Sequence, residues 1–216
     1  MNEDELRTGM ILGESAGLAK FAMTEIILLV VVLAGLGTAS DLLGWERGGL
    51  LSYNIASLAL GYAVTLTMIR KGGLGHDTSR GFGAYFGIGI LSGLGIVAGL
   101  VVLIIPGIFL AVRWSAAYGF ALGDGAGVTA SMGRSWEDTK PHFLAILGAL
   151  AMPLVVFVPV FILAVATADE TGATPDWVTI VLNVATAGYS AANTVLGVGI
   201  YSLVRSTRQR HAEVFA

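Results

Sequence analysis

A long, almost uncharged stretch constrains the fold of this chain more than any other feature of its sequence. Residues 81–123 number 43 and include a single charged side chain, that of Arg113. As one straight helix the stretch would be about 65 Å long, whereas the hydrocarbon core of a bilayer is about 30 Å thick. It therefore fits two crossings, and Pro106 and Gly107 near its middle are typical of a turn. We predict a helical hairpin within a membrane.

The composition of the whole chain agrees with a membrane protein. Apolar residues make up 55% of the 216 residues and charged residues 12%, against about 25% charged in soluble domains. The net charge of −3 argues against a nucleic-acid partner, and the lack of cysteine excludes disulfides and thiolate metal sites. The N-terminal residues are acidic, unlike a signal peptide, so we expect the first helix to be retained.

Low-charge segments long enough to cross a bilayer recur along the chain. We predict an all-α fold, a single six-helix transmembrane domain over residues 1–216. The predicted spans are residues 21–40, 48–69, 83–104, 106–123, 142–168 and 177–204. With both termini inside, ten of the 12 Lys and Arg residues fall on the inner side and only Arg47 on the outer side, a strong positive-inside bias. The expected location is the inner (plasma) membrane, with both termini cytoplasmic.

Two segments beside the spans are predicted to lie near the inner face. Residues 11–20 mix apolar and polar side chains at helical spacing, which indicates either a short surface helix or a plain extension of the first span. Residues 128–140 are predicted to form a second surface helix. In it Trp136 would sit at headgroup depth, with Arg134 and Lys140 near anionic lipid.

Arg113 is the most informative single residue, because an arginine within a span costs several kcal/mol unless it is paired or reaches the membrane surface. Counted from Pro106, it lies about 10 Å from the outer end of its helix. We expect its side chain to reach the outer face, to pair with Asp41 or to bind a carbonyl freed by a proline; a substrate site is the alternative. The predicted lipid- or partner-binding residues are Arg113, Arg134, Trp136 and Lys140.

Glycines and prolines mark predicted packing and bending sites. Glycines four positions apart let membrane helices approach closely. The predicted third span carries three such pairs, formed by Gly83, Gly87, Gly89, Gly93, Gly95 and Gly99. Packing within the bundle is the favoured interpretation, and a dimer interface or sliding surface is the alternative. Pro153 and Pro159 are expected to kink the fifth span, as a static bend or as a hinge.

Polar side chains in the second and sixth spans are interpreted chiefly as interhelical hydrogen-bonding groups, with the lining of a pathway as the alternative. They are Tyr53, Asn54, Ser57, Asn183, Tyr189, Asn193 and Thr194. A transporter would bring Arg113, Asn54 and Asn193 around one wet cavity. A lipid-binding module would hold Arg113 in a lateral cleft or in a dry pair.

One pattern resembles a known family. Its positions are Ile105, Pro106, Gly107, Ile108, Arg113, Ala130, Arg134, Ser135, Trp136 and Lys140. This IPGI turn, followed by an arginine and a cytoplasmic helix, resembles the YciC-type membrane proteins and the membrane-anchor domain of glycerophosphoryl diester phosphodiesterases. The resemblance implies a six-helix bundle. It implies no activity for this chain, because the catalytic domain of those phosphodiesterases is a separate soluble module.

These features predict a non-catalytic multi-pass membrane protein, a lipid- or partner-binding module involved in membrane organisation, with no cofactor. Its expected partners are membrane lipids, with another membrane protein or a second copy of the chain as further alternatives. A transporter or channel for a small solute is the second hypothesis. An enzyme is the third hypothesis. The sequence argues against it, because His76, His142 and His211 fall in separate segments and no catalytic or metal-ligand motif is present.

Overall fold

The computed structural model describes residues 6–75, 81–170 and 172–214, apart from the side chains of Glu46 and residues 210–214. These residues form helices and no strand, which confirms the all-α prediction. In chain order the elements are α1 (Thr8–Ala19), η1 (Lys20–Ala22), α2 (Met23–Leu43), α3 (Glu46–Lys71), α4 (Gly81–Val102), α5 (Ile104–Arg113), α6 (Ala117–Gly123), α7 (Val128–Thr139), η2 (Lys140–His142), α8 (Phe143–Ala151), α9 (Leu154–Thr167) and α10 (Asp176–Val214).

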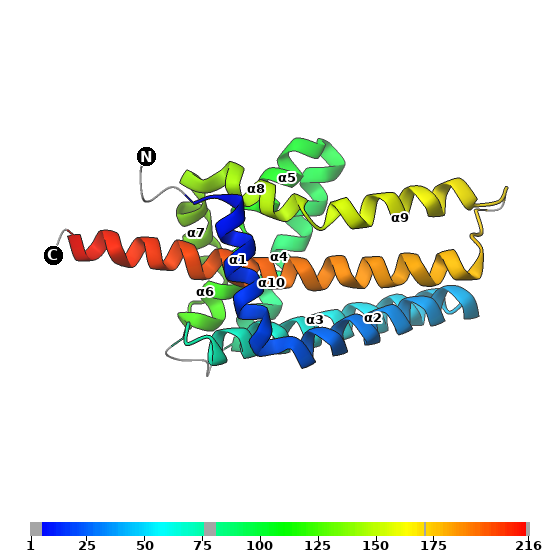
Figure 1. Cartoon of the computed structure of the whole chain (residues 1–216), viewed down its shortest axis with the longest axis horizontal. Coiled ribbons are helices and arrows are strands. Elements are labelled where there is room, and N and C mark those ends of the chain that lie inside the picture. The colour runs from blue at the N-terminus through cyan, green and yellow to red at the C-terminus, as the bar shows by residue number, and fades with distance from the viewer. Residues whose placement is uncertain (1–5, 76–80, 171, 215–216) are drawn as a thin grey trace.

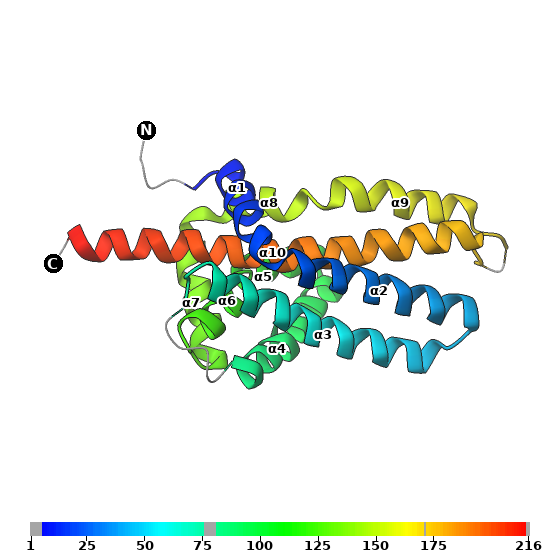
Figure 2. The ribbon, with the colours of Figure 1, turned by 60° about the horizontal axis from the view of Figure 1, so that its bottom comes forward.

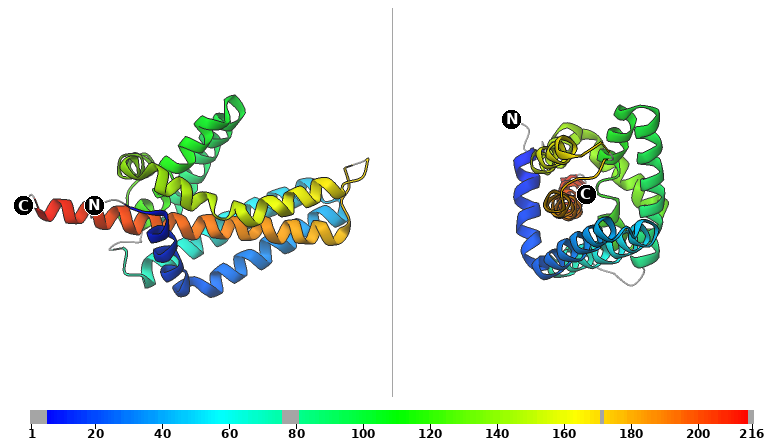
Figure 3. Two further views of the ribbon diagram at one scale, coloured as in Figure 1. Left: turned by 45° about the horizontal axis from the view of Figure 1, so that its top comes forward. Right: turned by 90° about the vertical axis from the view of Figure 1, so that its right-hand side faces the viewer.

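Four helices, α2, α3, α9 and α10, run along the long axis of the molecule (Figure 1, Figure 2). The α2–α3 and α9–α10 connections lie at one end, and both termini lie at the other. The 39-residue α10 runs through the middle of the molecule (Figure 3, right) and packs against α1, α2, α6 and α9. The α2–α3 connection is tight because Gly44 takes a left-handed conformation, with φ of 65°, that glycine adopts without steric cost.

The outside of the molecule is strongly apolar. Large hydrophobic side chains are exposed along α2, α4, α5 and α9, and Val101 and Ile105 are each 80% exposed. Within the described residues, four helices are long and apolar enough to cross a membrane, or five if the bent helices on either side of Pro153 form one span. The more polar α10 is not one of them. These helices are what a membrane protein requires.

The predicted hairpin is formed by α4 and α5, but its turn comes at Leu103, earlier than the predicted Pro106 and Gly107. Pro106 lies instead in the first turn of α5, where a helix does not use the backbone N–H that proline lacks. Gly107 packs directly against Gly99 of α4. The hairpin tilts away from the bundle, and its turn stops well short of the end that carries the α2–α3 connection (Figure 3, left).

The second arm of the hairpin is interrupted. α5 ends at Arg113 and a short turn precedes α6, so the predicted span 106–123 is not one continuous helix. Backbone groups freed inside a membrane need partners, and α7 supplies them. Ser135 Oγ donates to the carbonyl of Arg113 (2.8 Å) and accepts from the N–H of Ala116 (3.2 Å). Thr139 Oγ1 donates to the same Arg113 carbonyl at 3.3 Å.

Two short helices, α1 and α7, lie across the bundle at the end that carries the termini (Figure 1). α1 buries Ile11, Ser15 and Leu18, and it packs chiefly against α10 and α8. α1 is a separate helix that lies across the bundle and is not a straight extension of α2, because the chain changes direction at η1. Of the two predicted kinks, Pro153 coincides with a 46° bend between α8 and α9. α9 continues through Pro159, so the loss of one backbone donor there does not end the helix.

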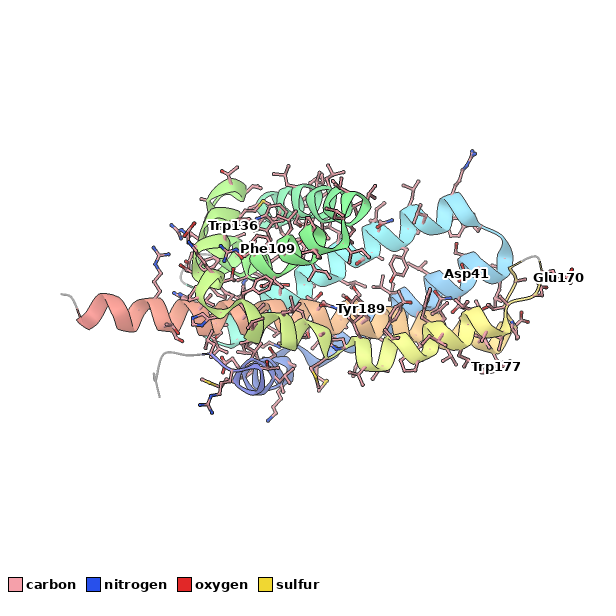
Figure 4. The ribbon with its side chains drawn as sticks, turned by 90° about the horizontal axis from the view of Figure 1, so that it is seen from above. Asp41, Phe109, Trp136, Glu170, Trp177 and Tyr189 are labelled. Carbon is pink, nitrogen blue, oxygen red and sulfur yellow. The ribbon has the colours of Figure 1, made fainter. Side chains whose placement is uncertain are left out.

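Basic side chains gather at the end of the molecule that carries the termini, and acidic Asp41 and Glu170 lie at the other end (Figure 4). The first group comprises Arg7, Lys20, Arg70, Lys71, Arg134, Lys140, Arg205 and Arg208. Apart from Arg113, only Arg47 among the described basic residues belongs to the opposite end. His76, Arg80 and the side chains of Arg210 and His211 lie outside the described residues.

Candidate functional site

A cavity of about 450 Å³ lies among α3, α4, α8 and α10, beside the α5–α6 turn. This volume falls within the range of roughly 300 to 1,000 Å³ that is usual for small-molecule sites. The lining residues are Tyr53, Thr65, Tyr85, Gly89, Ser92, Gly93, Ile96, Ala111, Trp114, Ser115, Tyr118, Leu150, Thr186, Tyr189, Ser190, Asn193, Thr194, Gly197 and Val198. None of them is charged, and more than half carry a hydroxyl or amide group.

One wall of the cavity is a polar stripe on α10. Its side chains recur three and four positions apart, which places them on one face of the helix. The stripe consists of Thr186, Tyr189, Ser190, Asn193 and Thr194, and Gly197 borders the cavity at the next position of the same spacing. Tyr189 marks its position about halfway along the bundle (Figure 4). Ala187 and Ala191 are buried in the core against α2 and α3, so α10 serves both packing and the cavity.

The facing wall is α4, whose small residues leave the space open. Gly89, Ser92 and Gly93 lie within one turn of each other in the lining. A Cβ atom added at Gly93 would meet nothing within 4 Å, and at Gly89 its nearest neighbour would be the Tyr118 hydroxyl at 3.4 Å. Two of the glycines predicted to pack helices together therefore border the cavity.

The remaining predicted packing glycines have other surroundings. Gly87 lies against α7, Gly95 against the α5–α6 turn and Gly99 against α5. A Cβ atom at any of these three would come within 2.7 or 2.8 Å of a neighbour, so each permits a close approach. Gly83 faces open space instead. Gly87, Gly95 and Gly99 thus each make a close contact within the chain.

Most hydroxyl and amide groups of the lining donate their hydrogen to their own helix. The acceptor in each case is a backbone carbonyl three or four residues earlier. The bonds run from Thr65 to Gly61 (2.8 Å), Ser92 to Ile88 (2.6 Å), Ser115 to Val112 (2.8 Å), Thr186 to Leu182 (2.8 Å), Asn193 to Tyr189 (2.8 Å) and Thr194 to Ser190 (3.0 Å).

This arrangement differs from the interhelical bonding favoured for the polar residues of the second and sixth spans. Tyr53, Tyr189, Asn193 and Thr194 line the cavity. Only Asn183 makes an interhelical side-chain bond, to Asp41 (2.8 Å), among the described members of that set. The three- and four-residue spacing along residues 177–204 was the signal that could have revealed the cavity wall. Asn54 and Ser57 do not line the cavity, and Asn54 bonds to the Leu50 carbonyl of its own helix.

Toward the termini, the cavity ends at α6 and Tyr201. α6 is buried over most of its length, and the Phe120 and Tyr201 rings meet edge to face at 5.1 Å. Gly119 and Gly123 are required there, because a Cβ atom at either position would overlap the Tyr201 side chain. α6 and Tyr201 therefore lie between the cavity and the C-terminal end of α10.

Next to α6, charged groups tie α7 and the segments that follow α3 and α6 to α10. Asp124 accepts from the Tyr201 hydroxyl (2.8 Å) and lies 3.4 Å from Arg205 Nε and 3.3 Å from Arg134 Nη1. Arg205 also donates to the carbonyl of Leu74 in the segment after α3. Arg134, expected near anionic lipid, is thus held by an acid of the same chain.

Arg113 lies next to α7 and is buried. It is 3% exposed, and its guanidinium carbon is 4.6 Å from the centre of the Trp136 ring and 5.6 Å from that of Phe109. Figure 4 shows Phe109 and Trp136 side by side. The expected contact with Asp41 is wrong, because Asp41 accepts from the Asn183 side chain and Arg113 packs on Trp136 and Phe109. The Arg113 side chain is buried and does not reach the surface of the molecule.

The four residues of the predicted binding set do not form one site. Arg113 and Trp136 touch, Arg134 binds Asp124, and Lys140 is exposed at the end of α7. The cavity contains neither Arg113 nor Asn54, which a transporter was expected to bring together with Asn193. Among the described residues, no group of three His, Asp or Glu side chains could hold a metal ion.

A scan against protein-family models matches no family, and searches of curated proteins and of solved structures give no match either. The resemblance to the YciC-type membrane proteins and to the phosphodiesterase membrane anchor therefore stays a prediction from the sequence.

Proposed function

We propose that this chain is a non-catalytic, multi-pass membrane module that binds a lipid within its helical bundle. The observation that carries the proposal is the cavity of about 450 Å³, lined by uncharged polar side chains inside a molecule with an apolar exterior. Its lining holds no carboxylate, imidazole, ammonium or guanidinium group. Those groups perform most acid–base catalysis, so the lining favours binding.

The apolar part of the lining favours a lipid over a water-soluble ligand. Ile96, Ala111 and Leu150 are half-buried at the cavity. On α4 the exposed side chain of Leu100 (42%) lies about one turn beyond Ile96 on the same face of the helix. Because the hairpin tilts away from the bundle, an acyl chain can follow this apolar surface into the bilayer while its headgroup meets the polar stripe.

The proposal includes a six-span arrangement with both termini on the cytoplasmic side of the inner membrane. In it α10 is the sixth span, and its polar face is turned to the cavity and not to lipid. The basic residues near the termini support this orientation. α1 and α7 would then lie at the inner face.

A transporter of a small uncharged solute is the second candidate. The observation that favours it is the length of the polar stripe, which covers about two turns of α10 from Thr186 to Thr194. In that case α6 and the ion pairs of Asp124 would form the barrier toward the cytoplasm.

Filling the cavity tests the proposal. Gly93→Trp places a large ring in the cavity without a clash at its Cβ atom, and Gly83→Trp is the matched control on the same helix. We expect native mass spectrometry from mild detergent to find lipid on the wild type and on Gly83→Trp, and none on Gly93→Trp. Equal lipid retention by all three proteins would refute the proposal. Uptake of an uncharged solute into liposomes that Gly93→Trp abolishes would favour the transporter.

A further inference from the structure

The lining of the cavity offers a ligand more hydrogen-bond acceptors than donors. A hydroxyl group has one hydrogen to donate and two lone pairs that accept. Thr65 and Ser92 donate to a carbonyl of their own helix and are also hydrogen-bonded to the side chains of Tyr85 and Tyr118. Thr186 and Thr194 each spend that hydrogen on a carbonyl of their own helix, at 2.8 and 3.0 Å. What these side chains can still offer a ligand is therefore acceptor capacity.

Asn193 adds to the same pattern. Its Nδ2 donates to the Tyr189 carbonyl at 2.8 Å, and its side-chain oxygen remains as an acceptor. The tyrosines of the lining, among them Tyr53 and Tyr189, carry hydroxyl groups that can either donate or accept. The cavity thus combines acceptors set by the helix backbones with a few adaptable phenols.

Charged ligands are poorly matched to this lining. A phosphate or carboxylate would meet acceptors and no cationic side chain, and an ammonium group would meet no carboxylate. Burying an unpaired charge is far more costly than burying a hydrogen-bonded hydroxyl. A ligand hydroxyl, in contrast, donates to the threonine and asparagine oxygens and accepts from the phenols.

We propose that the cavity selects an uncharged, hydroxyl-bearing group, of the kind found in the headgroup of a glycerol lipid or in a free polyol. This inference rests on the proposed binding function and names the chemistry that the site recognises. Thr186 and Thr194, two turns apart on α10, are specificity-determining residues of the site.

The experiment compares ligands that share a chain and differ in headgroup. Purified wild-type protein in detergent is titrated with monoolein, with methyl oleate, which lacks hydroxyl groups, and with oleate, which is anionic. Binding is measured by native mass spectrometry. Monoolein is expected to bind at least about tenfold more tightly than the other two, since more than one hydrogen bond is at stake. Competition by free glycerol then distinguishes a free polyol from a lipid headgroup as the source of the hydroxyl groups. Displacement of monoolein indicates a polyol site, and no displacement indicates a lipid site.

Three variants test which side chains cause the preference for monoolein over methyl oleate. Thr186→Val and Thr194→Val each keep the shape of the side chain and remove one acceptor. Thr167→Val is the control, because Thr167 makes the same bond to its own helix, to Leu163 at 2.9 Å, and does not line the cavity. Each cavity variant should weaken monoolein binding roughly three- to tenfold and leave methyl oleate unchanged.

The outcomes separate this inference from the proposed function. Equal binding of monoolein and methyl oleate, lost together in Gly93→Trp, would overturn the hydroxyl selectivity while the lipid-binding function stands. Loss of monoolein affinity to the same degree in Thr167→Val would also overturn it. If Gly93→Trp binds every probe as the wild type does, the cavity is not the binding site and both proposals fail.

Discussion

At the scale of single residues, Arg113 shows how aromatic rings hold a buried cation, beside the carboxylate of Glu137. A desolvated contact between a guanidinium and an aromatic face contributes about 2 kcal/mol, and Arg113 has two such contacts, with Trp136 and Phe109. Their sum is comparable with the several kcal/mol that an arginine inside a membrane costs. The planar shape of the guanidinium suits this stacking, whereas an ammonium group does not stack.

We therefore expect a graded loss of stability when Arg113 is replaced. Arg113→Lys should lower the melting temperature in detergent slightly, and Arg113→Ala by roughly 5 °C, because the aromatic contacts and the packing are both lost. The measurement is thermal unfolding followed by tryptophan fluorescence. Wild-type melting behaviour in both variants would show that the aromatic contacts do not stabilise the protein.

Asp138 of α7 makes the stability of the folded protein depend on pH. Burial raises the pKa of its carboxyl above the ordinary value of 3.8, and Arg208, 3.6 Å away, opposes this only in part. A raised pKa in the folded state means that folding binds protons, so stability falls as pH rises from about 3.8 through the raised pKa.

The prediction for Asp138 follows from that sign. Asp138→Asn removes the titration, so its melting temperature relative to the wild type should rise as the pH passes upward through this window. Thermal melts of both proteins across a pH series measure the difference in melting temperature. The other carboxyl groups contribute equally to both proteins, so their contributions cancel in this difference. A difference that stays constant with pH would contradict the prediction.

At the scale of elements, α7 has a buried face that carries hydroxyl groups and an exposed face that carries charges. Its buried face carries Ser131, Ser135 and Thr139, spaced four apart, and two of these hydroxyl groups stabilise the interruption between α5 and α6. Its other side carries exposed charged residues beside half-buried Trp136. Such a helix suits the boundary between a membrane and water.

A sole-tryptophan protein tests the depth of α7. With Trp45, Trp114 and Trp177 changed to Phe, the fluorescence of Trp136 should be quenched by lipids brominated near the headgroup more than by lipids brominated at the chain ends. The reason is that α7 lies across the bundle at the proposed inner face. Strong quenching by aqueous iodide, with none from brominated lipid, would place α7 in solution.

The elements also show what the sequence can and cannot predict. Helix positions follow from apolar length, so the predicted spans 21–40 and 48–69 match α2 and α3 closely. The interruption after Arg113 could not be predicted, because its backbone groups are satisfied by Ser135, which is distant in the sequence. The cavity wall on α10 was visible as a periodic polar pattern, but the open space opposite it depends on the tilt of α4.

At the scale of the whole molecule, the charge distribution supports the proposed orientation, with both termini inside. Reporter fusions after Gly44 and Gly172 should read outside the cell membrane, and fusions after Gly73 and Thr139 inside. The physical reason is the excess of Lys and Arg at the end that carries the termini. An outside signal after Thr139 would mean that the hairpin of α4 and α5 does not return to the side from which it started.

The polar stripe of α10 has a consequence for the synthesis of this protein. Helices enter the bilayer from the translocation channel according to their hydrophobicity, and polar residues at mid-helix oppose entry. α10 has the stripe at its centre and is not among the helices apolar enough to cross alone. Its entry should therefore depend on the helices made before it. If the helices that precede α9 were deleted, the last segment would fail to enter the bilayer and would be left on the outer side of the membrane, open to proteolysis.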